Sequence, residues 1–222
     1  MICDLMRDAI EKCGGPADLV QAIEIPSLEL TNELMAQCDR VLATGGGAMV
    51  NAAYSSGTPA LGVGVGNAVI TVDDTADLDD AAEKIRISKT LDLAASCSSD
   101  NSVILVEPIY DEMISKLKEK GGFLVSEDQK EKLKKTLWDE EGHLNTAIVA
   151  QPAQKIAEMA NIEIPEETGF YIVPETGWGK DFPFSGEKLS VIMALYKADN
   201  IDHAIELTNN IPVSYTHLRA HE

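Results

Sequence analysis

The chain has 222 residues, 45% of them hydrophobic and 25% charged, which is the composition of an ordinary globular protein with a buried core. Its formal net charge of −19 at pH 7 argues against nucleic acid or an anionic membrane as a partner, because both attract clustered basic residues. No apolar run reaches the roughly 18 residues that span a bilayer, and no signal-peptide pattern stands at the start.

The four cysteines are widely spaced and include no Cys-x-x-Cys pair: Cys3, Cys13, Cys38 and Cys97. This spacing predicts free thiols rather than a disulfide framework or a zinc site. Free thiols are typical of a reducing compartment, so we expect a cytoplasmic protein without a bound metal.

Helices and strands are predicted in turn along the first part of the chain. Residues 1–15 have the pattern of an amphipathic helix that ends at two glycines, and residues 19–25 are strand-like. A second helix is predicted over residues 27–37, with Ser27 as its N-cap, followed by a short apolar strand over residues 39–43. This strand leads directly into a glycine turn.

The glycine turn, Thr-Gly-Gly-Gly at residues 44–47, connects that strand to a helix predicted over residues 48–55. A strand, a glycine turn and a helix in succession offer backbone N–H groups and a helix N-terminus to a phosphate. A tight turn without any ligand would have the same sequence. The pattern alone therefore leaves both interpretations open.

Glycine alternates with valine over residues 62–66, so this segment can pass close to another group without obstruction by side chains. Further strands are predicted at residues 68–72, 102–106, 169–173 and 189–196, and further helices at 78–93, 108–120, 126–138, 154–160 and 200–209. The alternation of strands and helices favours an α/β fold with a parallel sheet.

Cys97 lies between a predicted helix and a predicted strand, in a turn rich in serine and alanine. Small neighbours keep its thiol sterically open, and loops between such elements commonly display reactive groups. The alternative is a buried and inert cysteine, since free cysteine is commonly buried in proteins.

Three segments together resemble the CoA-acylating aldehyde dehydrogenases. Residues 44–67 resemble the cofactor-side segment of that family, and residues 89–103, with Lys-Thr-Leu-Asp and Ala-Ser-Cys-Ser-Ser-Asp-Asn-Ser-Val, resemble its nucleophile segment. Residues 183–190 are similar to its Ser-x-Glu-Lys-Leu-Ser motif. The resemblance implies an aldehyde dehydrogenase-like α/β fold, with a partial Rossmann-like cofactor-binding domain at residues 1–87 and an incomplete catalytic domain at residues 88–211.

The resemblance also implies the role of several residues. Cys97 would be the nucleophile that attacks an aldehyde and carries the acyl group as a thioester, with its own backbone N–H as a candidate oxyanion donor. Thr44, Gly45, Gly46 and Gly64 would belong to the cofactor site. The N–H groups of Gly45 and Gly46 would lie near the pyrophosphate.

Glu187 matches the glutamate that holds the nicotinamide ribose in the wider superfamily. A carboxylate on a surface loop is the alternative interpretation of this residue. Asn67 and Lys89, within the resembling segments, are expected to form structural hydrogen bonds rather than to take part in catalysis.

The expected fate of the thioester depends on a carboxylate that the chain lacks. Hydrolytic relatives carry the base for the deacylating water in a Glu-Leu-Gly-Gly motif, and the matching residues 62–65 are Gly-Val-Gly-Val. Without a base for water, transfer of the acyl group to an external thiol is the expected exit. The external thiol that the resemblance implies is coenzyme A, as co-substrate. The resemblance also implies NAD as cofactor, with NADP as an alternative.

Acetaldehyde is the leading candidate substrate, and sulfoacetaldehyde is second because the motif at residues 183–190 also resembles that of the acylating sulfoacetaldehyde dehydrogenases. A sulfonate would need a cationic group, for which Lys180 and Arg86 are candidates. A homo-oligomer is implied for the full-length relative. An inactive fragment with a scaffolding role is the alternative from a different functional class.

Both ends of the sequence depart from the family pattern. Family members have a long segment before the position of Met1, and residues 212–222 resemble a translated sequencing adapter rather than the family. Val191 also replaces the proline of the family motif. These departures lead us to expect a fragment of a longer enzyme.

Overall fold

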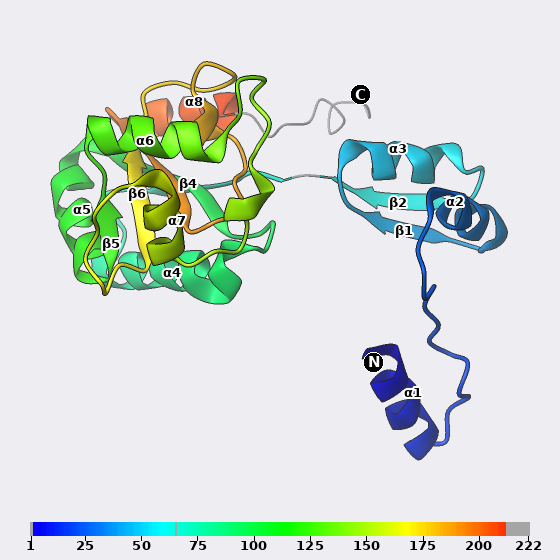
Figure 1. Cartoon of the computed structure of the whole chain (residues 1–222). Coiled ribbons are helices and arrows are strands. Elements are labelled where there is room, and N and C mark those ends of the chain that lie inside the picture. Colours follow the sequence, from blue (N-terminus) through cyan, green and yellow to red (C-terminus); the bar gives the residue numbers. More distant parts are fainter. Residues whose placement is uncertain (1, 65, 212–222) are drawn as a thin grey trace. The chain divides into compact units, whose positions relative to one another are not determined.

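The protein is described by a computed structural model over residues 2–64 and 66–211, and these two ranges form two compact units (Figure 1). Both units place strands in parallel pairs, as the alternating pattern predicted. Their cores differ greatly in size.

The first unit is built around a two-stranded sheet. Its elements are α1 (Ile2–Lys12), α2 (Leu28–Gln37), β1 (Val41–Thr44), α3 (Gly47–Ser55) and β2 (Ala60–Val63). Strands β1 and β2 pair in parallel, and a cluster of four buried apolar residues forms the core: Met35, Val41, Ala43 and Ala53. Ser27 caps α2 as expected, since its hydroxyl accepts from the Leu30 N–H at 3.1 Å.

The second unit contains a five-stranded sheet in the order β3-β4-β7-β6-β5, with every neighbouring pair parallel. The strands are β3 (Ala68–Val72), β4 (Asp100–Val106), β5 (Gly122–Leu124), β6 (Phe170–Pro174) and β7 (Ile192–Ala198). The helices that surround the sheet in Figure 1 are α4 (Leu78–Thr90), α5 (Tyr110–Glu119), α6 (Glu127–Leu137), α7 (Ala153–Ala160) and α8 (Ile201–Asn210). Every residue of β4 is buried, as in parallel sheets covered on both faces.

Several of these elements have clear local causes. Ser126 and Gln129 form a reciprocal capping box that begins α6, as their spacing predicted. The Asp77 side chain accepts from the N–H groups of Asp79 and Asp80 and begins α4. No helix within the described ranges, 2–64 and 66–211, has the length and apolar character that crossing a bilayer requires.

The predicted strand at residues 19–25 is wrong, because this segment is irregular. Instead of pairing with a neighbouring strand, the carbonyl of Val20 accepts from Arg7 Nε at 2.7 Å and from Cys3 Sγ at 3.4 Å. The three β-branched residues of this segment, Val20, Ile23 and Ile25, do not make a strand without a partner for their backbone groups.

Three further details differ from the sequence prediction. Strand β5, which was missed, begins at Gly122, and a Cβ there would lie 2.7 Å from the Leu117 carbonyl. Helix α4 ends at Thr90 rather than at residue 93. Strand β7 begins at Ile192 rather than at Leu189, because Leu189 has a left-handed φ of 44° that an extended strand cannot accommodate.

The division into compact units falls after Gly64, whereas the predicted functional boundary lay at residue 87. The difference arises because β3 pairs with β4 in the five-stranded sheet, so the chain has already entered the second unit at that point. The assignment of residues 1–87 to cofactor binding and of 88–211 to catalysis stays a prediction. The predicted tail, 212–222, lies outside the described residues.

Candidate active site

The parallel pairing of β1 with β2 brings four predicted cofactor residues to one edge of the first unit. Thr44, the last residue of β1, is in register with Val63, the last residue of β2. Gly45 and Gly46 follow the first strand, and Gly64 follows the second. Carboxyl ends of parallel strands are where α/β folds commonly bind ligands, so the topology favours the predicted grouping.

The two glycines differ in the backbone N–H that each could offer to a phosphate. The N–H of Gly45 donates to the Val63 carbonyl at 3.0 Å, so it is used within the fold. Gly46 is the N-cap of α3, and a side chain at Gly46 or Gly47 would meet nothing within 4 Å. The N–H groups in the open first turn of α3 are therefore better placed than that of Gly45 to donate hydrogen bonds to a phosphate.

Gly62 is needed for packing. A Cβ at this position would lie 2.6 Å from the Val50 side chain and 3.0 Å from that of Tyr54, both in α3. The Tyr54 hydroxyl also accepts from the Gly62 N–H at 3.1 Å. At Gly62 the chain therefore packs helix α3 directly against strand β2.

Cys97 lies in an exposed turn of the second unit, between α4 and β4. The turn follows Asp92, Leu93 and Ala94, which all have left-handed φ values, 48°, 54° and 56°. Three such residues in succession without glycine store backbone strain, which tends to occur at functional sites. The alternative of a buried cysteine is wrong, and the thiol is accessible.

Ser88, near the end of α4, holds the chain that follows Cys97. Its hydroxyl accepts from the Asp100 N–H at 2.9 Å, and its carbonyl accepts from the Ser99 hydroxyl at 3.2 Å. The thiol is thus exposed on a loop whose C-terminal end is held by hydrogen bonds to a helix residue. Such a loop can present a nucleophile with little loss of entropy on reaction.

Gly66 lies beside both Cys97 and Glu187. A Cβ on Gly66 would lie 3.5 Å from the Cys97 carbonyl, and the Gly66 N–H donates to the Glu187 carboxylate. The structure thus brings two predicted site residues from distant parts of the sequence to the same glycine segment.

Glu187 is half-buried, and its Oε1 atom is shielded from solvent without a hydrogen-bond partner among the residues that the structure describes. Desolvation raises the pKa of this carboxyl, while the Gly66 N–H and the neighbouring Lys188 offset part of the rise. A shielded acceptor without a donor is the feature expected where a ligand hydroxyl binds.

Asn67 and Lys89 form the structural hydrogen bonds that were expected of them. Asn67 Nδ2 donates to the Ser185 carbonyl at 2.7 Å, and Lys89 Nζ donates to the Ser190 carbonyl at 2.8 Å. Desolvation lowers the pKa of Lys89 to about 7, against an opposing effect of Asp100. Both side chains tie the two site segments to the loop around Glu187.

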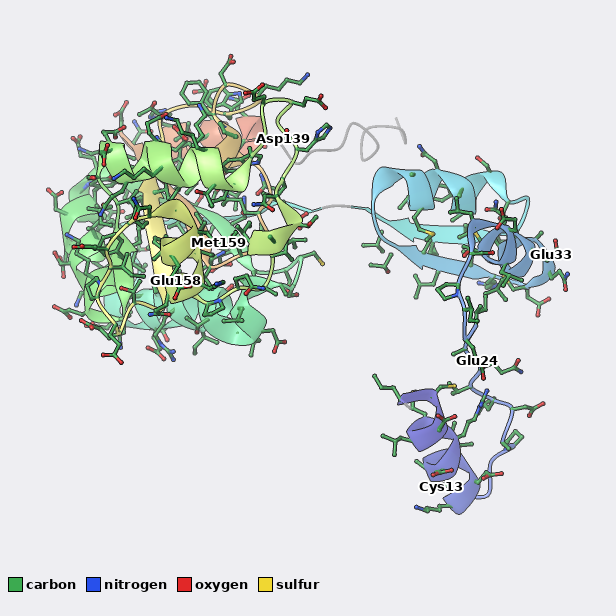
Figure 2. The ribbon with its side chains drawn as sticks, in the orientation of Figure 1. Cys13, Glu24, Glu33, Asp139, Glu158 and Met159 are labelled. Atoms are coloured by element: carbon green, nitrogen blue, oxygen red, sulfur yellow. The ribbon has the colours of Figure 1, made fainter. Side chains whose placement is uncertain are left out.

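A cavity of about 1300 Å³ lies beside Glu187. Its walls come from α6, from the turn that contains Asp139, which Figure 2 labels, and from residues of the loop at 179–187. Lys180 and Trp138 line it, whereas Cys97 does not. The cavity is large enough for an extended nucleotide-sized ligand on this side of Glu187.

The two candidates for a sulfonate clamp differ in their surroundings. Arg86 forms an ion pair with Glu83, its neighbour on α4, and does not line the cavity. Lys180 is exposed in the cavity wall that also contains Glu187. Over residues 2–64 and 66–211, no cluster of three His, Cys, Asp or Glu side chains could hold a metal ion.

Two residues of the second unit were missed from the sequence, Asn101 and Lys188, and both are buried polar groups beneath the site. Lys188 has no exposed surface, although it stands within the recognised Glu-Lys-Leu-Ser motif. Its position between a carboxylate and a leucine is the only local signal. No local pattern marks Asn101.

The fold defines a class: a parallel α/β protein whose candidate residues gather at loops next to the strands. Within that class the chain belongs to the aldehyde dehydrogenase family, which it matches over residues 1–216. It is 44% identical over 220 residues to a sulfoacetaldehyde dehydrogenase from an Acholeplasma species, covering 97% of this chain and 45% of that protein. To an aldehyde-alcohol dehydrogenase from Clostridium acetobutylicum it is 40% identical over 199 residues, covering 90% and 23%.

Solved structures show the same fold. An acetylating aldehyde dehydrogenase from Geobacillus thermoglucosidasius superimposes with a TM-score of 0.89 at 39% identity, covering 93% of this chain and 46% of that one. A propionaldehyde dehydrogenase from Rhodopseudomonas palustris with bound propionyl-CoA gives 0.85 at 28% identity, covering 93% and 46%. An engineered glycolyl-CoA reductase with bound NADP+ gives 0.84 at 27% identity, covering 93% and 47%. The chain therefore spans about half the length of the acylating enzymes that it matches.

Proposed function

We propose that the protein takes part in the NAD-dependent oxidation of a small aldehyde to an acyl-CoA, with Cys97 as the nucleophile. The observation that carries this proposal is the meeting of three segments at Gly66, which lies against the Cys97 carbonyl and donates to Glu187. The similarity to acylating dehydrogenases supports the reaction type. Because the chain spans only part of those proteins, the activity of the whole enzyme is inferred.

The reaction on Cys97 follows from thiol chemistry. The thiolate attacks the aldehyde carbon to form a thiohemiacetal, in which the carbonyl oxygen becomes an oxyanion that the Cys97 backbone N–H can stabilise. A bound nicotinamide ring would supply the acceptor for the hydride that leaves this carbon. The result is a thioester on Cys97, with the carbonyl double bond restored.

Each unit, taken by itself, contains residues suited to one part of a dinucleotide. The shielded Oε1 atom of Glu187 lacks a donor within the described part of the chain, and a ribose hydroxyl would supply one. Thr44, Gly46, Gly64 and the first turn of α3 would hold the phosphates, with Gly45 as the side-chain-free connection between them. A relative with bound NADP+ supports a nicotinamide cofactor, and NAD is our choice between the two.

Coenzyme A is the proposed acceptor of the acyl group. Its thiolate attacks the thioester carbon, acyl-CoA leaves, and the Cys97 thiolate is regenerated. Gly62 is packed against Val50 and Tyr54 and brings no carboxylate to activate water. A relative with bound propionyl-CoA supports this acceptor.

Acetaldehyde is the proposed substrate, and sulfoacetaldehyde is the second candidate. The second is favoured by the 44% identity to sulfoacetaldehyde dehydrogenases and by the exposed Lys180 in the cavity beside Glu187. Comparing kcat/KM for the two aldehydes on the same preparation decides between them. A cytoplasmic location, supported by four free thiols, and a homo-oligomeric full-length enzyme belong to the same proposal.

The test compares the unaltered chain with Cys97→Ala and with Cys13→Ala, a matched change at another exposed cysteine. Each protein is incubated with NAD, aldehyde and coenzyme A. We expect NADH and acyl-CoA from the unaltered chain and from Cys13→Ala, and neither product from Cys97→Ala.

Replacing coenzyme A by buffer tests the missing base, and NADH formation should then stop after at most one turnover per Cys97. Sustained NADH formation with water as acceptor would contradict the acyl transfer. An unaltered, folded chain that forms no product would instead support the inactive fragment.

A further inference from the structure

The segment before Glu187 presents its backbone carbonyl groups to the interior of the second unit. Three successive carbonyls, at residues 184–186, each accept a hydrogen bond from a buried side chain. Lys188 Nζ donates to the first at 2.6 Å, Asn67 Nδ2 to the second at 2.7 Å and Asn101 Nδ2 to the third at 2.7 Å. Two of these donors are far away in the sequence, so tertiary contacts rather than a local turn fix the loop.

Asn101 connects all of these segments. Its amide nitrogen donates both to the Oδ1 atom of Asn67 and to the Gly186 carbonyl, and its own carbonyl accepts from Lys188 Nζ at 3.4 Å. An amide nitrogen carries two hydrogens, so both are used. The residue is 4% exposed and stands at the start of β4, directly after the loop of Cys97.

The same contacts extend to both candidate site residues. Asn67 follows Gly66, which lies against the Cys97 carbonyl and donates to the Glu187 carboxylate. A shift of Asn101 would therefore release the Glu187 loop on one side and the glycine segment on the other.

We propose that Asn101 is a positioning residue that sets the distance between the Cys97 loop and the Glu187 loop through its bonds to Asn67 and Gly186. This inference rests on the proposed function, in which these two residues hold the acyl group and the cofactor ribose. Asn101 touches neither substrate nor cofactor, and it acts through the backbone that carries Glu187. Asparagine fits this role because its amide offers two donors from one atom, whereas aspartate of the same size offers none.

The experiment compares Asn101→Asp with Tyr171→Phe in the full chain. The control removes another buried hydrogen bond of the second unit, from the Tyr171 hydroxyl to the Ala153 carbonyl at 2.7 Å. Two readouts are amide hydrogen exchange over residues 184–188 and the alkylation rate of Cys97. The rate is measured by mass spectrometry relative to Cys13, the exposed thiol after α1 (Figure 2).

We expect Asn101→Asp to speed exchange over residues 184–188 by on the order of tenfold. The Gly186 carbonyl loses the shorter of its two bonds, from Asn101 at 2.7 Å, and keeps the one from Lys188 Nζ at 2.9 Å, while Asn67 Oδ1 loses its bond from Asn101. The ratio of Cys97 to Cys13 alkylation should change as well. Tyr171→Phe should change neither readout, although its Tm also falls. Asn101→Ser, which is neutral and smaller, takes the place of the aspartate variant if that protein does not fold.

Equal exchange and equal alkylation in the Asn101 variant and the Tyr171 control would overturn the proposal. Neither readout requires turnover, so an inactive chain with a released loop would overturn the proposed function and support this inference. Where turnover is measured, KM for NAD should rise by a larger factor than kcat falls, because the displaced group binds the cofactor. A fall in kcat alone would also count against the positioning role.

Discussion

The candidate residues of the two units are supported by apolar cores of very different size. In the first unit the phosphate turn stands on two short strands with a core of four buried residues, Met35, Val41, Ala43 and Ala53. In the second unit Cys97 and Glu187 are carried by loops beside a five-stranded sheet with a continuous apolar core. Since apolar burial is the main source of stability, we infer that the second unit holds its geometry more firmly than the first.

The two units also differ in the kind of chemical group that each offers. The first unit offers backbone N–H groups at a helix N-terminus, which need little more than a correct turn. The second unit offers a thiol and a carboxylate, whose directions depend on side-chain hydrogen bonds such as those of Asn101. The candidate residues that need aligned side chains therefore lie in the unit with the larger core.

The largest expected effect comes from a cavity in the core of the second unit. Ile104 is fully buried in β4, between its register partners Thr71 in β3 and Tyr196 in β7. Ile104→Ala should lower the free energy of unfolding of this unit by about 2–5 kcal/mol. Hydrogen exchange should show faster opening over residues 66–211 and unchanged exchange over residues 2–64. Equal loss of protection in both ranges would show that the units do not unfold separately.

A smaller effect is expected from overpacking the first unit. Gly62→Val adds a side chain whose Cβ would lie 2.6 Å from the Val50 side chain and 3.0 Å from that of Tyr54. The cost should be about 1–3 kcal/mol, confined to exchange within residues 2–64. Gly47→Ala, in the first turn of α3, is the matched control, because a Cβ at this position would meet nothing within 4 Å. If both variants destabilise this unit equally, the packing role of Gly62 is wrong.

Much of the fold followed from local sequence signals. The capping box of Ser126 and Gln129, the apolar strand before Gly45 and the alternation of elements each depend on neighbouring residues, and each was predicted. Strand β5 was missed because three residues beginning with Gly122 become a strand only through pairing with β6.

The support of the site could not be predicted in the same way. The bond from Asn67 to the Ser185 carbonyl joins residues 118 positions apart, and no local pattern specifies such a contact. The motif around Glu187 indicated a role for its carboxylate, but it gave no sign that Lys188 beside it turns inward. Burial of a lysine is the opposite of its usual preference. Here its ammonium group donates to the Phe184 and Gly186 carbonyls of its own loop and to the Asn101 carbonyl of a distant segment.

A pH-dependent effect should distinguish the second unit from the first. Burial lowers the pKa of Lys89 to about 7 in the folded protein, whereas the unfolded chain keeps the ordinary value of 10.5. Between these values the unfolded state binds more protons, so the free energy of unfolding rises with pH, by at most about 1.4 kcal/mol per pH unit from this group. Asp100, which favours the charged lysine, and Lys188, whose own pKa is lowered first by burial and then by Lys89, both remain in Lys89→Met.

Urea unfolding of the unaltered chain and of Lys89→Met at pH 7, 8 and 9 checks this expectation. The stability of the unaltered chain relative to the variant should increase at each step. A difference that stays constant with pH would show that Lys89 has the same pKa in both states. The signal should come from residues 66–211 alone, since Lys89 lies in the second unit.

The smallest expected effect concerns the choice between acetaldehyde and sulfoacetaldehyde. The candidate residue for this choice, Lys180, lies in the second unit. Lys180 is exposed, so a contact with a sulfonate would contribute only about 0–1 kcal/mol, equivalent to at most about a fivefold change in KM. Lys180→Gln should raise KM for sulfoacetaldehyde within that range and leave KM for acetaldehyde unchanged. Lys155→Gln is the control, because Lys155 is an exposed lysine on α7 that pairs with Glu158 (Figure 2).

The salt dependence makes this last experiment decisive despite the small effect. A contact between Lys180 and a sulfonate is screened by added salt, so the difference between Lys180→Gln and the unaltered chain should shrink as ionic strength rises. A loss of packing at the cavity wall would instead persist at high salt and affect acetaldehyde as well. Equal changes in KM for both aldehydes would therefore remove Lys180 as a sulfonate ligand, and with it the structural argument for sulfoacetaldehyde over acetaldehyde.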